Sequence, residues 1–277
     1  MKLTLAFGIF NKAYHLEQLL ESWLSTLSGM CQYEVIVVCD ACIDGSPDIA
    51  RAVLEQHEEQ LTRWAVVETP DVYEIEQNNT ALRWADPNSD LILFIQDDNL
   101  IHDEGWDAWL IEAYRSVAKP GAVALLAGGI FLADGFSYER IESCRPHKGE
   151  HFTKHGIAEE QYPPAIYSVD FITRPFAAST SLLREMGGLG GEGWDVICWD
   201  DTDLSIKLLR AGYTNLYVAL DVLNLSTGQQ TMPDMMRQGF ENNHALFLEA
   251  HQTWLQARDG NTFKFIEPLL WATTRES

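Results

Sequence analysis

The chain has 277 residues, of which 46% are hydrophobic and nine are tryptophan, so it can bury one sizeable core and is not a disordered polypeptide. Its formal charge of −22 excludes the clustered basic surface with which proteins bind nucleic acids and anionic membranes. An anionic substrate would need local compensation from a divalent cation or from a few placed basic residues.

The opening segment MKLTLAFGIFNK is interpreted as a first strand and not as a signal peptide. Asn11 and Lys12 interrupt its hydrophobic run, and no cleavage site of small residues follows. No segment approaches the roughly 18–20 hydrophobic residues of a membrane-spanning helix. Five cysteines without a regular spacing favour a reducing compartment over a disulfide framework. We therefore expect a cytoplasmic protein without a transmembrane segment.

The first half of the chain alternates short hydrophobic runs with amphipathic stretches, which is typical of βα units on a mostly parallel sheet. Residues 134–170 lose this periodicity, and we interpret them as an insertion that faces the substrate. The tail from residue 232 onward is expected to be largely helical. Strands are expected at residues 3–9, 34–40, 64–68, 90–96, 122–126 and 216–219, and helices at residues 15–27, 46–57, 79–84, 106–116, 181–186 and 202–211.

Carboxylates follow two of the expected strands at the point where each strand ends. Asp40 ends the run EVIVVCD, and Asp97 and Asp98 follow the run DLILFIQ. Ligands of open α/β sheets bind at the carboxyl ends of strands, so these side chains are expected to face one crevice. A carboxylate at a strand end can accept hydrogen bonds from a pyrimidine or from ribose hydroxyls. The alternative for Asp40 is ordinary turn chemistry, because Asp-Gly-Ser follows shortly after it.

The segment WDDTDLSIKLLRAGY combines an acidic beginning with leucines at helical spacing. Asp200, Asp201 and Asp203 lie at its start. The helix dipole alone favours acidic residues at a helix N-terminus. Adjacent carboxylates can also raise each other's pKa toward a value useful for proton transfer.

Five segments, in the order GIFNK, EVIVVCDACIDGS, Asn79, FIQDDN and WDDTDLSIKLLRAGY, resemble the successive landmarks of family 2 glycosyltransferases. They span residues 3 to about 220. The resemblance implies an α/β fold of GT-A type, which is a Rossmann-like, mostly parallel sheet flanked by helices, here with a helical C-terminal tail. We expect a glycosyltransferase domain over residues 1–230 and a C-terminal helical appendage over residues 231–277 that packs on the same domain.

The resemblance also implies a donor site at the carboxyl ends of the strands. Asp40 would recognise the nucleotide base, and Asp98 would contact a divalent cation, Mg²⁺ or Mn²⁺, that neutralises the diphosphate. Gln96 stands where the family's metal-binding DxD motif usually has its first Asp, and the stretch DVLNLSTG lacks the histidine that often completes the cation site. The residues expected to bind the donor nucleotide are Phe7, Ile9, Asn11, Asp40, Asn79 and Asp97.

On the acceptor side, the resemblance implies that Asp201 is the catalytic base, with Asp200 as the close alternative. For Lys207 and Arg210, the alternative to a phosphate contact is the solvated face of an amphipathic helix. The weaker acceptor or phosphate candidates are Arg184, Trp199, Lys207 and Arg210.

The predicted activity is hexosyl transfer, EC class 2.4, with inversion at the anomeric carbon. The donor would be a nucleoside diphosphate sugar, a UDP-sugar first, and the acceptor a hydroxyl of a carbohydrate or lipid-linked molecule in polysaccharide biosynthesis. The alternative is a catalytically degenerate protein of this scaffold that binds a sugar or a nucleotide. A nucleotidyltransferase would need a basic, glycine-rich loop near the N-terminus, and GIFNKAYH does not resemble one.

Three further motifs have weaker interpretations. Gly188, Gly190 and Gly193 match G-x-G-x-x-G, but the strand before and the helix after that a dinucleotide site requires are missing. Cys39 and Cys42 form a C-x-x-C motif between a strand and a helix, where a thioredoxin-like redox pair would lie.

Three histidines in the irregular region form the last motif. His147, His151 and His155 recur at intervals of four, as the ligands of a metal on one helical face would. Gly149 and Gly156 oppose a stable helix there, so scattered histidines in a loop are the alternative.

Overall fold

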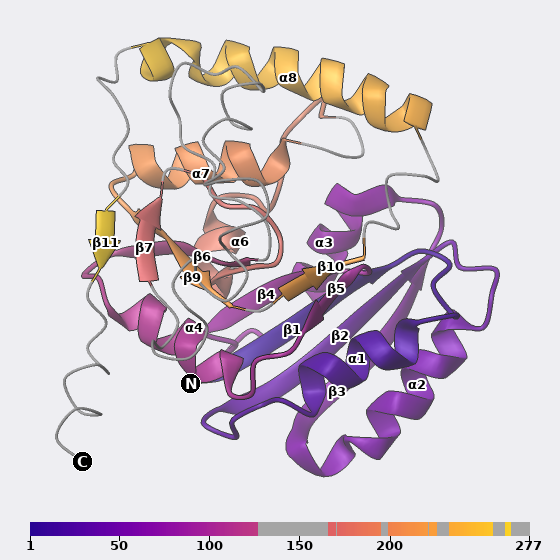
Figure 1. Ribbon diagram of the computed structural model, residues 1–277. Coiled ribbons are helices and arrows are strands. Elements are labelled where there is room, and N and C mark those ends of the chain that lie inside the picture. The colour runs from indigo at the N-terminus through magenta and orange to yellow at the C-terminus, as the bar shows by residue number, and fades with distance from the viewer. Residues whose placement is uncertain are drawn as a thin grey trace, which may run out of the picture.

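A β-sheet forms the centre of the molecule, and helices cover both of its faces (Figure 1). The structure is a computed structural model that describes residues 1–126, 166–169, 171–194, 199–220, 222–225, 233–256 and 264–266. The three histidines 147, 151 and 155 and most of the expected insertion therefore lie outside the described residues. The α/β architecture expected from the sequence is confirmed.

The strands of the main sheet are β1 (Lys2–Ile9), β2 (Gln32–Asp40), β3 (Leu61–Thr69), β4 (Leu91–Gln96), β6 (Pro120–Leu126), β7 (Ile166–Val169), β8 (Phe176–Ser179), β9 (Thr214–Ala219) and β11 (Lys264–Ile266). A second sheet pairs β5 (Asn99–Ile101) with β10 (Val222–Asn224). The helices are α1 (Leu16–Leu24), α2 (Ser46–Gln56), α3 (Tyr73–Trp84), α4 (Trp106–Arg115), α6 (Thr180–Glu185), α7 (Asp200–Arg210) and α8 (Pro233–Gln256), with a short 3-10 helix at Glu58–Gln60.

Within the described residues the main sheet has nine strands in the order β11-β7-β9-β6-β8-β4-β1-β2-β3. The strands β1, β2, β3 and β4 are parallel, as the alternating pattern predicts. The strand β8 runs antiparallel between β4 and β6, and β7 runs antiparallel to β9, so the sheet is mixed beyond its first half. The register places Gly8 beside both Val38 and Gln96, which brings the carboxyl ends of three strands together.

The buried strands divide their side chains between two hydrophobic clusters, one on each face of the sheet. Alternate residues of β1, such as Leu5 and Phe7, join the cluster that includes α1, α2 and α4. Ala6 between them joins the cluster that includes α3, α6 and α7. Because side chains alternate along a strand, a sheet covered on both faces needs hydrophobic residues at nearly every position. The run VIVV in β2 meets this requirement.

Helix α3 begins at Tyr73, six residues before the helix expected at 79–84. The side chain that caps its first turn is Asp40, which accepts hydrogen bonds from the backbone N–H groups of Val72 and Tyr73 at 2.8 Å each. An N-cap normally lies immediately before its helix in the chain. Here the cap is supplied by another strand, so the local sequence does not contain the signal.

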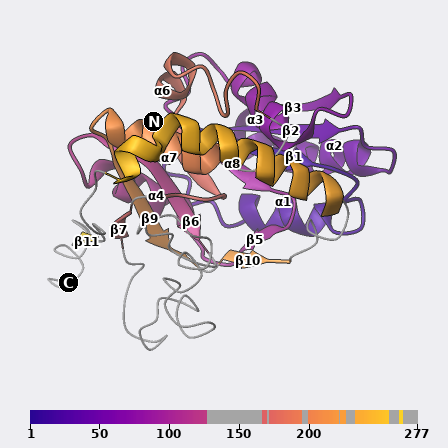
Figure 2. The same cartoon turned by 90° about the horizontal axis from the view of Figure 1, so that it is seen from above.

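The C-terminal residues pack on the rest of the fold. Helix α8 lies over α7 in both views (Figures 1 and 2), and Phe247 of α8 is buried against Trp199 and Ile206. His251 of α8 contacts Asp203 of α7 with 2.7 Å between Nε2 and Oδ1. The strand β11 pairs with β7, so the tail contributes a strand as well as the expected helix.

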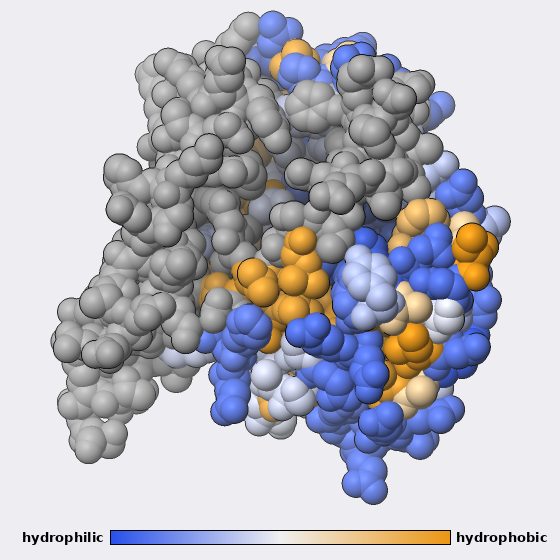
Figure 3. All heavy atoms as spheres, turned by 45° about the vertical axis from the view of Figure 1, so that its right-hand side comes forward, coloured by the Kyte–Doolittle hydropathy of each residue, from blue (hydrophilic) through white to orange (hydrophobic). Residues whose placement is uncertain are grey.

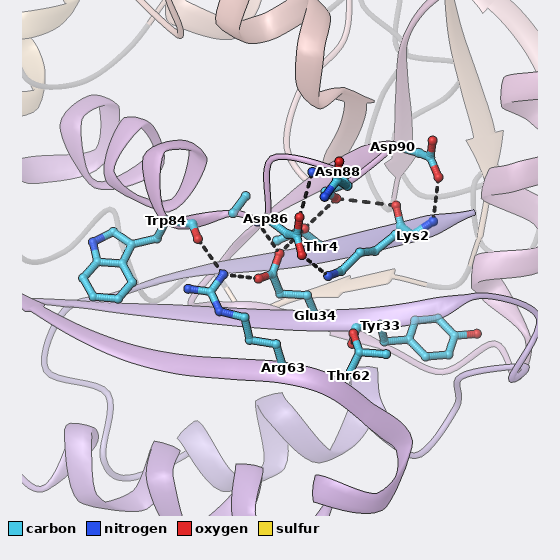
Figure 4. Close-up of polar contacts among 12 residues, drawn as sticks. Lys2, Thr4, Tyr33, Glu34, Thr62, Arg63, Trp84, Asp86, Asn88 and Asp90 are labelled. Atoms are coloured by element: carbon cyan, nitrogen blue, oxygen red, sulfur yellow. Dashed lines mark hydrogen bonds and ion pairs between the residues drawn. The ribbon is translucent and has the colours of Figure 1, made fainter.

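Glu34 is a fully buried carboxylate near the amino-terminal end of the sheet (Figure 4). Thr4 donates a hydrogen bond to it at 2.7 Å, the backbone N–H of Asp86 donates another at 2.9 Å, and Arg63 forms an ion pair with it. Arg63 also donates to the carbonyl oxygen of Trp84 at 2.8 Å, at the end of α3. A buried charge is tolerated only when it is paired and hydrogen-bonded, as Glu34 is.

On the face shown in Figure 3, hydrophilic residues cover most of the described surface, and hydrophobic residues form only small separate patches. In the part of the chain that the structure describes, no helix is both long enough and hydrophobic enough to cross a membrane.

Candidate active site

The site lies at the carboxyl ends of β1, β2 and β4, where the sequence predicts a ligand crevice. Gln77 of α3 ties two of these strand ends together, because its side-chain amide donates to the carbonyl oxygens of Ile9 and Val38 at 3.1 and 3.0 Å. A Cβ atom on Gly8 would lie 2.5 Å from the Gln77 side-chain oxygen. The glycine of the GIFNK segment therefore makes room for this buried amide.

The Asp40 carboxylate is only 3% exposed and is satisfied from within the chain. Besides the two backbone N–H groups at the start of α3, Thr69 donates a hydrogen bond to it at 2.9 Å. Its position at the end of β2 is the predicted one. Its oxygens already fix the start of α3, so recognition of a nucleotide base by Asp40 stays a prediction.

Asp97 follows β4 and is held by the connection between β1 and α1. The backbone N–H of Phe10 donates to its carboxylate at 3.2 Å, and the buried amine of Lys12 lies 3.6 Å from it. The ring of His15 contacts the Asp97 carbonyl oxygen at 2.7 Å. Burial raises the pKa of Asp97 to about 7, although the charge of Lys12 and the Phe10 N–H act to lower it.

The neighbouring Asp98 is 8% exposed and lies where β5 and β10 meet. Asn99 donates a hydrogen bond to its side chain at 3.3 Å, and the backbone N–H of Leu225 donates to its carbonyl oxygen at 2.7 Å. The Gln96 amide donates to Glu74 at 2.8 Å and accepts from Asn99 at 3.3 Å. Gln96 therefore joins the end of β4 to the first turn of α3.

Arg174 lies at the centre of an acidic cluster, which we define as Glu74, Asp200 and Asp201. The guanidinium is buried and forms an ion pair with both oxygens of Asp200. Its Nη1 lies 3.8 Å from Asp201, and its Nε lies 3.7 Å from Glu74. Burial acts to lower the pKa of Arg174, but the charges of these carboxylates outweigh it and raise that pKa above its ordinary value.

The two aspartates that begin α7 have different surroundings. The Asp200 side chain is 1% exposed, and both of its oxygens accept hydrogen bonds from Arg174. The Asp201 side chain is 17% exposed and makes only the long contact with Arg174 and hydrogen bonds with Thr202. Burial, together with the charge of Asp200, raises the pKa of Asp201 to about 6. Of the pair, Asp201 is the accessible carboxylate that can take up a proton near neutral pH.

Glu74 connects the acidic cluster with the strand ends. Burial raises the pKa of Glu74, and the negative charges of Asp200 and Asp98 raise it further, while Arg174 acts to lower it. Glu74 contacts both Gln96 at the end of β4 and Arg174 at the centre of the acidic cluster. The chain of contacts from Gln96 through Glu74 and Arg174 to Asp201 therefore places the expected donor side and the expected base in one region.

Several predicted site residues have other contacts. The side chains of Phe7 and Ile9 are fully buried in the hydrophobic core, so only their backbone atoms could face a ligand. Asn11 lies at the strand ends as expected, and its side-chain oxygen accepts a hydrogen bond from the Ile43 N–H at 2.9 Å. Asn79 exchanges hydrogen bonds with the backbone of Leu189, at 3.0 and 2.8 Å, and so holds the glycine-rich loop.

The four weaker candidates also make structural contacts. Arg184 donates to the carbonyl oxygens of Leu82 and Ala85 at 3.0 and 2.8 Å, at the end of α3 that is opposite to Glu74. An α-helix of 12 residues is about 18 Å long, so Arg184 is remote from the acidic cluster. The contacts of the other three lie elsewhere: Lys207 pairs with Asp203 at 2.5 Å, Arg210 contacts α8, and Trp199 stacks on His244 with 4.7 Å between ring centroids.

A cleft of about 1050 Å³ opens at the same far end of α3, lined by Arg63, Trp84 and Arg184 among others. None of the carboxylates of the acidic cluster lines it. The glycine-rich loop reaches this cleft through Gly187 and Gly188, so the described part of that loop lies on the Arg184 side of α3.

Arg174, Glu74, Lys12 and His15 are the residues of the site that sequence reasoning missed. The available signal for Arg174 is a single basic residue between two hydrophobic runs, FIT and PFAA, in a strongly acidic chain. An arginine is buried only when it is paired, so this pattern predicts a carboxylate partner without identifying it. Glu74 has no such signal, because it looks like the acidic first turn of any helix.

The acidic residues could share a divalent cation with a bound phosphate group. Among the described residues, five carboxylates lie in this region, Glu74, Asp97, Asp98, Asp200 and Asp201, and Lys12 and Arg174 form ion pairs with four of them. In the part of the chain that the structure describes, no three His, Cys, Asp or Glu side chains converge as a complete metal site. A cation bound by one or two carboxylates and completed by substrate phosphates, which is common for Mg²⁺, would fit this arrangement.

Solved structures with the same arrangement of elements are those of nucleotide-sugar glycosyltransferases. The mannosyltransferase PcManGT from Pyrobaculum calidifontis, in complex with GDP-Man and Mn²⁺, has a TM-score of 0.60 and 17% identity, and the match covers 89% of this chain and 64% of that one. S. aureus TarS 1-349 in complex with UDP has a TM-score of 0.50 and 16% identity, with 79% and 58% covered. This chain therefore spans less than two thirds of either. Its sequence matches no protein-family model and no curated protein.

At these identities the likeness defines the fold, which is the GT-A-like fold of nucleotide-sugar glycosyltransferases. The fold expected from the sequence motifs is thus confirmed. Membership of family 2 stays a prediction.

Proposed function

We propose that this chain is a glycosyltransferase that moves a sugar from a nucleoside diphosphate sugar to a hydroxyl group of an acceptor, with inversion. The observation that carries the proposal is the difference between Asp200 and Asp201 in their contacts with Arg174 and in their exposure. Arg174 neutralises Asp200, which leaves Asp201 as an accessible carboxylate with a pKa of about 6. A general base works best when its pKa is near the operating pH.

In the proposed reaction Asp201 accepts the proton of the acceptor hydroxyl as that oxygen attacks the anomeric carbon. The bond from this carbon to the diphosphate breaks on the opposite face, and no covalent intermediate with the protein is needed. Asp200 and Arg174 hold the first turn of α7, and Glu74 holds Arg174 from α3. Because of the motifs in its sequence, we expect this chain to be a member of glycosyltransferase family 2.

The donor side is proposed at the strand ends, where Asp98 would hold a divalent cation. When bound, such an ion neutralises charge on the diphosphate oxygens as they leave. The position of Asp98 just after β4, at the carboxyl ends of the parallel strands, supports this assignment. The ligands named with the similar structures are GDP-Man and UDP, so both nucleotide classes are candidates, with a UDP-sugar as the first expectation. A carbohydrate or lipid-linked acceptor in polysaccharide biosynthesis completes the proposal.

The test is calorimetric titration of the protein with UDP, GDP and dTDP, each with and without Mn²⁺. We expect saturable binding of one nucleotide that weakens when Mn²⁺ is omitted and when Asp98 is replaced in Asp98→Ala. The control is Asp48→Ala, because the Asp48 side chain is 90% exposed on α2 and lies outside the proposed site. A folded wild-type protein that binds none of the three nucleotides would contradict the proposal.

A catalytically degenerate nucleotide- or sugar-binding protein is the second candidate, and Gln96 favours it. The Gln96 amide is occupied by Glu74 and Asn99, so it does not replace the missing first carboxylate of a DxD motif. This candidate predicts nucleotide binding that does not depend on Mn²⁺, and no release of nucleoside diphosphate from a sugar nucleotide. Measuring that release with GDP-mannose and UDP-N-acetylglucosamine distinguishes the two.

A further inference from the structure

Cys39 and Cys42 lie together at the edge of the proposed donor site and have no part in the proposed reaction. Cys39 is the penultimate residue of β2 and is 1% exposed in the hydrophobic core. Ala41, with φ of 44°, turns the chain so that Cys42 packs against the same hydrophobic cluster while remaining partly exposed. Ile9 is the register partner of Cys39, and its carbonyl oxygen also contacts the Cys42 sulfur, so both cysteines lie at the end of β1.

The Cys42 thiol also joins two connections that border the donor side. The backbone N–H of Asn11 donates to the sulfur at 3.4 Å, and the thiol donates to the carbonyl oxygen of Ile9 at 3.5 Å. The next residue, Ile43, donates its N–H to the Asn11 side chain. The Cys42 sulfur therefore lies between the end of β1 and the segment that leads into α2. Its partner Asn11 is the residue before Lys12 in the chain.

The two thiols are electrostatically unequal. The hydrogen bond from Cys39 lowers the pKa of Cys42, and the Asn11 N–H lowers it further, although burial opposes both. The same pair interaction, together with burial, raises the pKa of Cys39. Cys31, which has no such partner thiol, has a pKa raised by burial to about 11. Thiolates are the reactive form of cysteine, so Cys42 is the more reactive of the three.

We propose that Cys39 and Cys42 form a redox-modification site, at which a low-molecular-weight disulfide such as oxidised glutathione converts the two thiols into an intramolecular disulfide. The Cys42 thiolate attacks one sulfur of the oxidant and expels the first small thiol. The Cys39 sulfur then loses its proton, attacks the Cys42 sulfur of the mixed disulfide and expels the second. Two protein thiols are oxidised, and one small disulfide is reduced to two thiols.

Closing this disulfide changes the contacts of the donor side. Cys42 then has no S–H group to donate to the Ile9 carbonyl oxygen, and the two sulfurs must approach to about 2.05 Å. The sulfur that accepts from the Asn11 N–H must move at the same time. We expect weaker nucleotide binding in the oxidised protein, and this consequence rests on the proposed function.

The test begins with the full chain incubated with excess oxidised glutathione, alkylated, and digested by a protease that cleaves after glutamate. Cleavage after Glu34 and Glu55 releases residues 35–55, which contain both cysteines and exclude Cys31. We expect this peptide to be two hydrogen atoms lighter and unalkylated, with the Cys31 peptide alkylated. Alkylation of both cysteines, or glutathione retained on Cys42 without ring closure, would overturn the proposal.

Serine variants control the assignment, and a binding measurement separates it from the proposed function. Cys42→Ser should abolish the light peptide, and Cys31→Ser should leave it unchanged. Nucleotide affinity in the presence of Mn²⁺ is then compared between the reduced and oxidised wild-type protein, with at least a several-fold loss expected on oxidation. Absence of binding in the reduced protein contradicts the proposed function alone, whereas absence of the light peptide contradicts this inference alone.

Discussion

The two ends of the sheet treat buried charge differently. At the amino-terminal end, Glu34 is fully buried and paired with Arg63, and hydrogen bonds from Lys2 lower the pKa of the neighbouring Asp86. At the carboxyl-terminal end, burial raises the pKa values of Asp97 and Asp201. The pKa of an aspartate is thus lowered at one end, at Asp86, and raised at the other, at Asp97 and Asp201.

This difference follows from the partners that each carboxylate has. Glu34 accepts hydrogen bonds from Thr4 and from a backbone N–H in addition to its ion pair, so its charge is compensated within the fold. At the carboxyl-terminal end, Arg174 is shared among three carboxylates of the described residues. Carboxylates with raised pKa values that share one basic group are costly for stability and are typical of sites that bind a cation or transfer protons.

The largest effect is expected from removing the proposed base, Asp201, at the carboxyl-terminal end of the sheet. Asp201→Asn should lower the rate of sugar transfer, or of donor hydrolysis with water as acceptor, by about 10²–10⁴-fold, because a positioned general base contributes roughly this factor. Folding should be retained, since Asp201 makes only one long ion pair. Steady-state release of nucleoside diphosphate measures the rate, and calorimetry measures donor affinity. Full activity in this variant would assign the base to another residue.

At the opposite end the effect should be on stability and not on activity. Glu34→Ala removes the buried acceptor of the Thr4 hydroxyl and of the Asp86 N–H, which costs about 1–3 kcal/mol. The lost ion pair adds little, because the Arg63 side chain is 38% exposed and can be solvated. Denaturant unfolding measures this change, with Glu68→Ala as the control, since Glu68 pairs with Arg51 on the surface. Equal midpoints for the two variants would show that the Glu34 network does not stabilise the fold.

The elements of the first half could be predicted from the sequence because their signals are local. Alternating hydrophobic runs, and the Ser-Pro pair at the start of α2, mark strands and a helix without reference to distant residues. The start of α3 could not be predicted in this way, since its cap is Asp40. The strand β8 was also missed, because FAAS is short and becomes a strand by pairing between β4 and β6.

The same distinction explains which parts of the site could be predicted. The strand-end carboxylates and the acidic start of α7 are contiguous motifs, so the sequence indicated Asp97, Asp98, Asp200 and Asp201. Arg174 acts through partners that are at least 26 residues away in the chain, and a single sequence contains no record of such pairings. The nucleotide-binding candidate Asn79 and the weaker candidate Arg184 lie on predicted elements. The Arg184 guanidinium binds carbonyl oxygens at the end of α3, and the Asn79 amide holds the glycine-rich loop, residues 187–193.

Asn79 has two competing interpretations. The sequence predicts that it binds the donor nucleotide, whereas in the structure its side chain is hydrogen-bonded to the backbone of Leu189. Asn79→Ala removes both hydrogen bonds to the largely buried Leu189, which should cost about 1–2 kcal/mol of stability. Nucleotide affinity should stay within twofold of the wild type, as measured by titration at a temperature where both proteins are folded. A loss of affinity with unchanged stability would instead support the role expected from the sequence.

The last expected effect is on the pH dependence of stability, and it tests the carboxyl-terminal end directly. The pKa of Asp201 is raised from 3.8 in the unfolded chain to about 6, so the folded protein binds more protons than the unfolded one between these values. The stability contribution of Asp201 is therefore present below about pH 4 and is lost as the pH rises through about 6. Asp201→Asn should flatten this decline, which denaturant unfolding at pH 4, 5, 6 and 7 measures.

Addition of Mn²⁺ and nucleotide to the wild type should flatten it as well, because positive charge near the carboxylates restores the compensation that Glu34 already has. An identical pH dependence in the wild type and in Asp201→Asn would mean that Asp201 is ionised throughout this range, and the contrast between the two ends of the sheet would then rest on Asp97 and Glu74 alone.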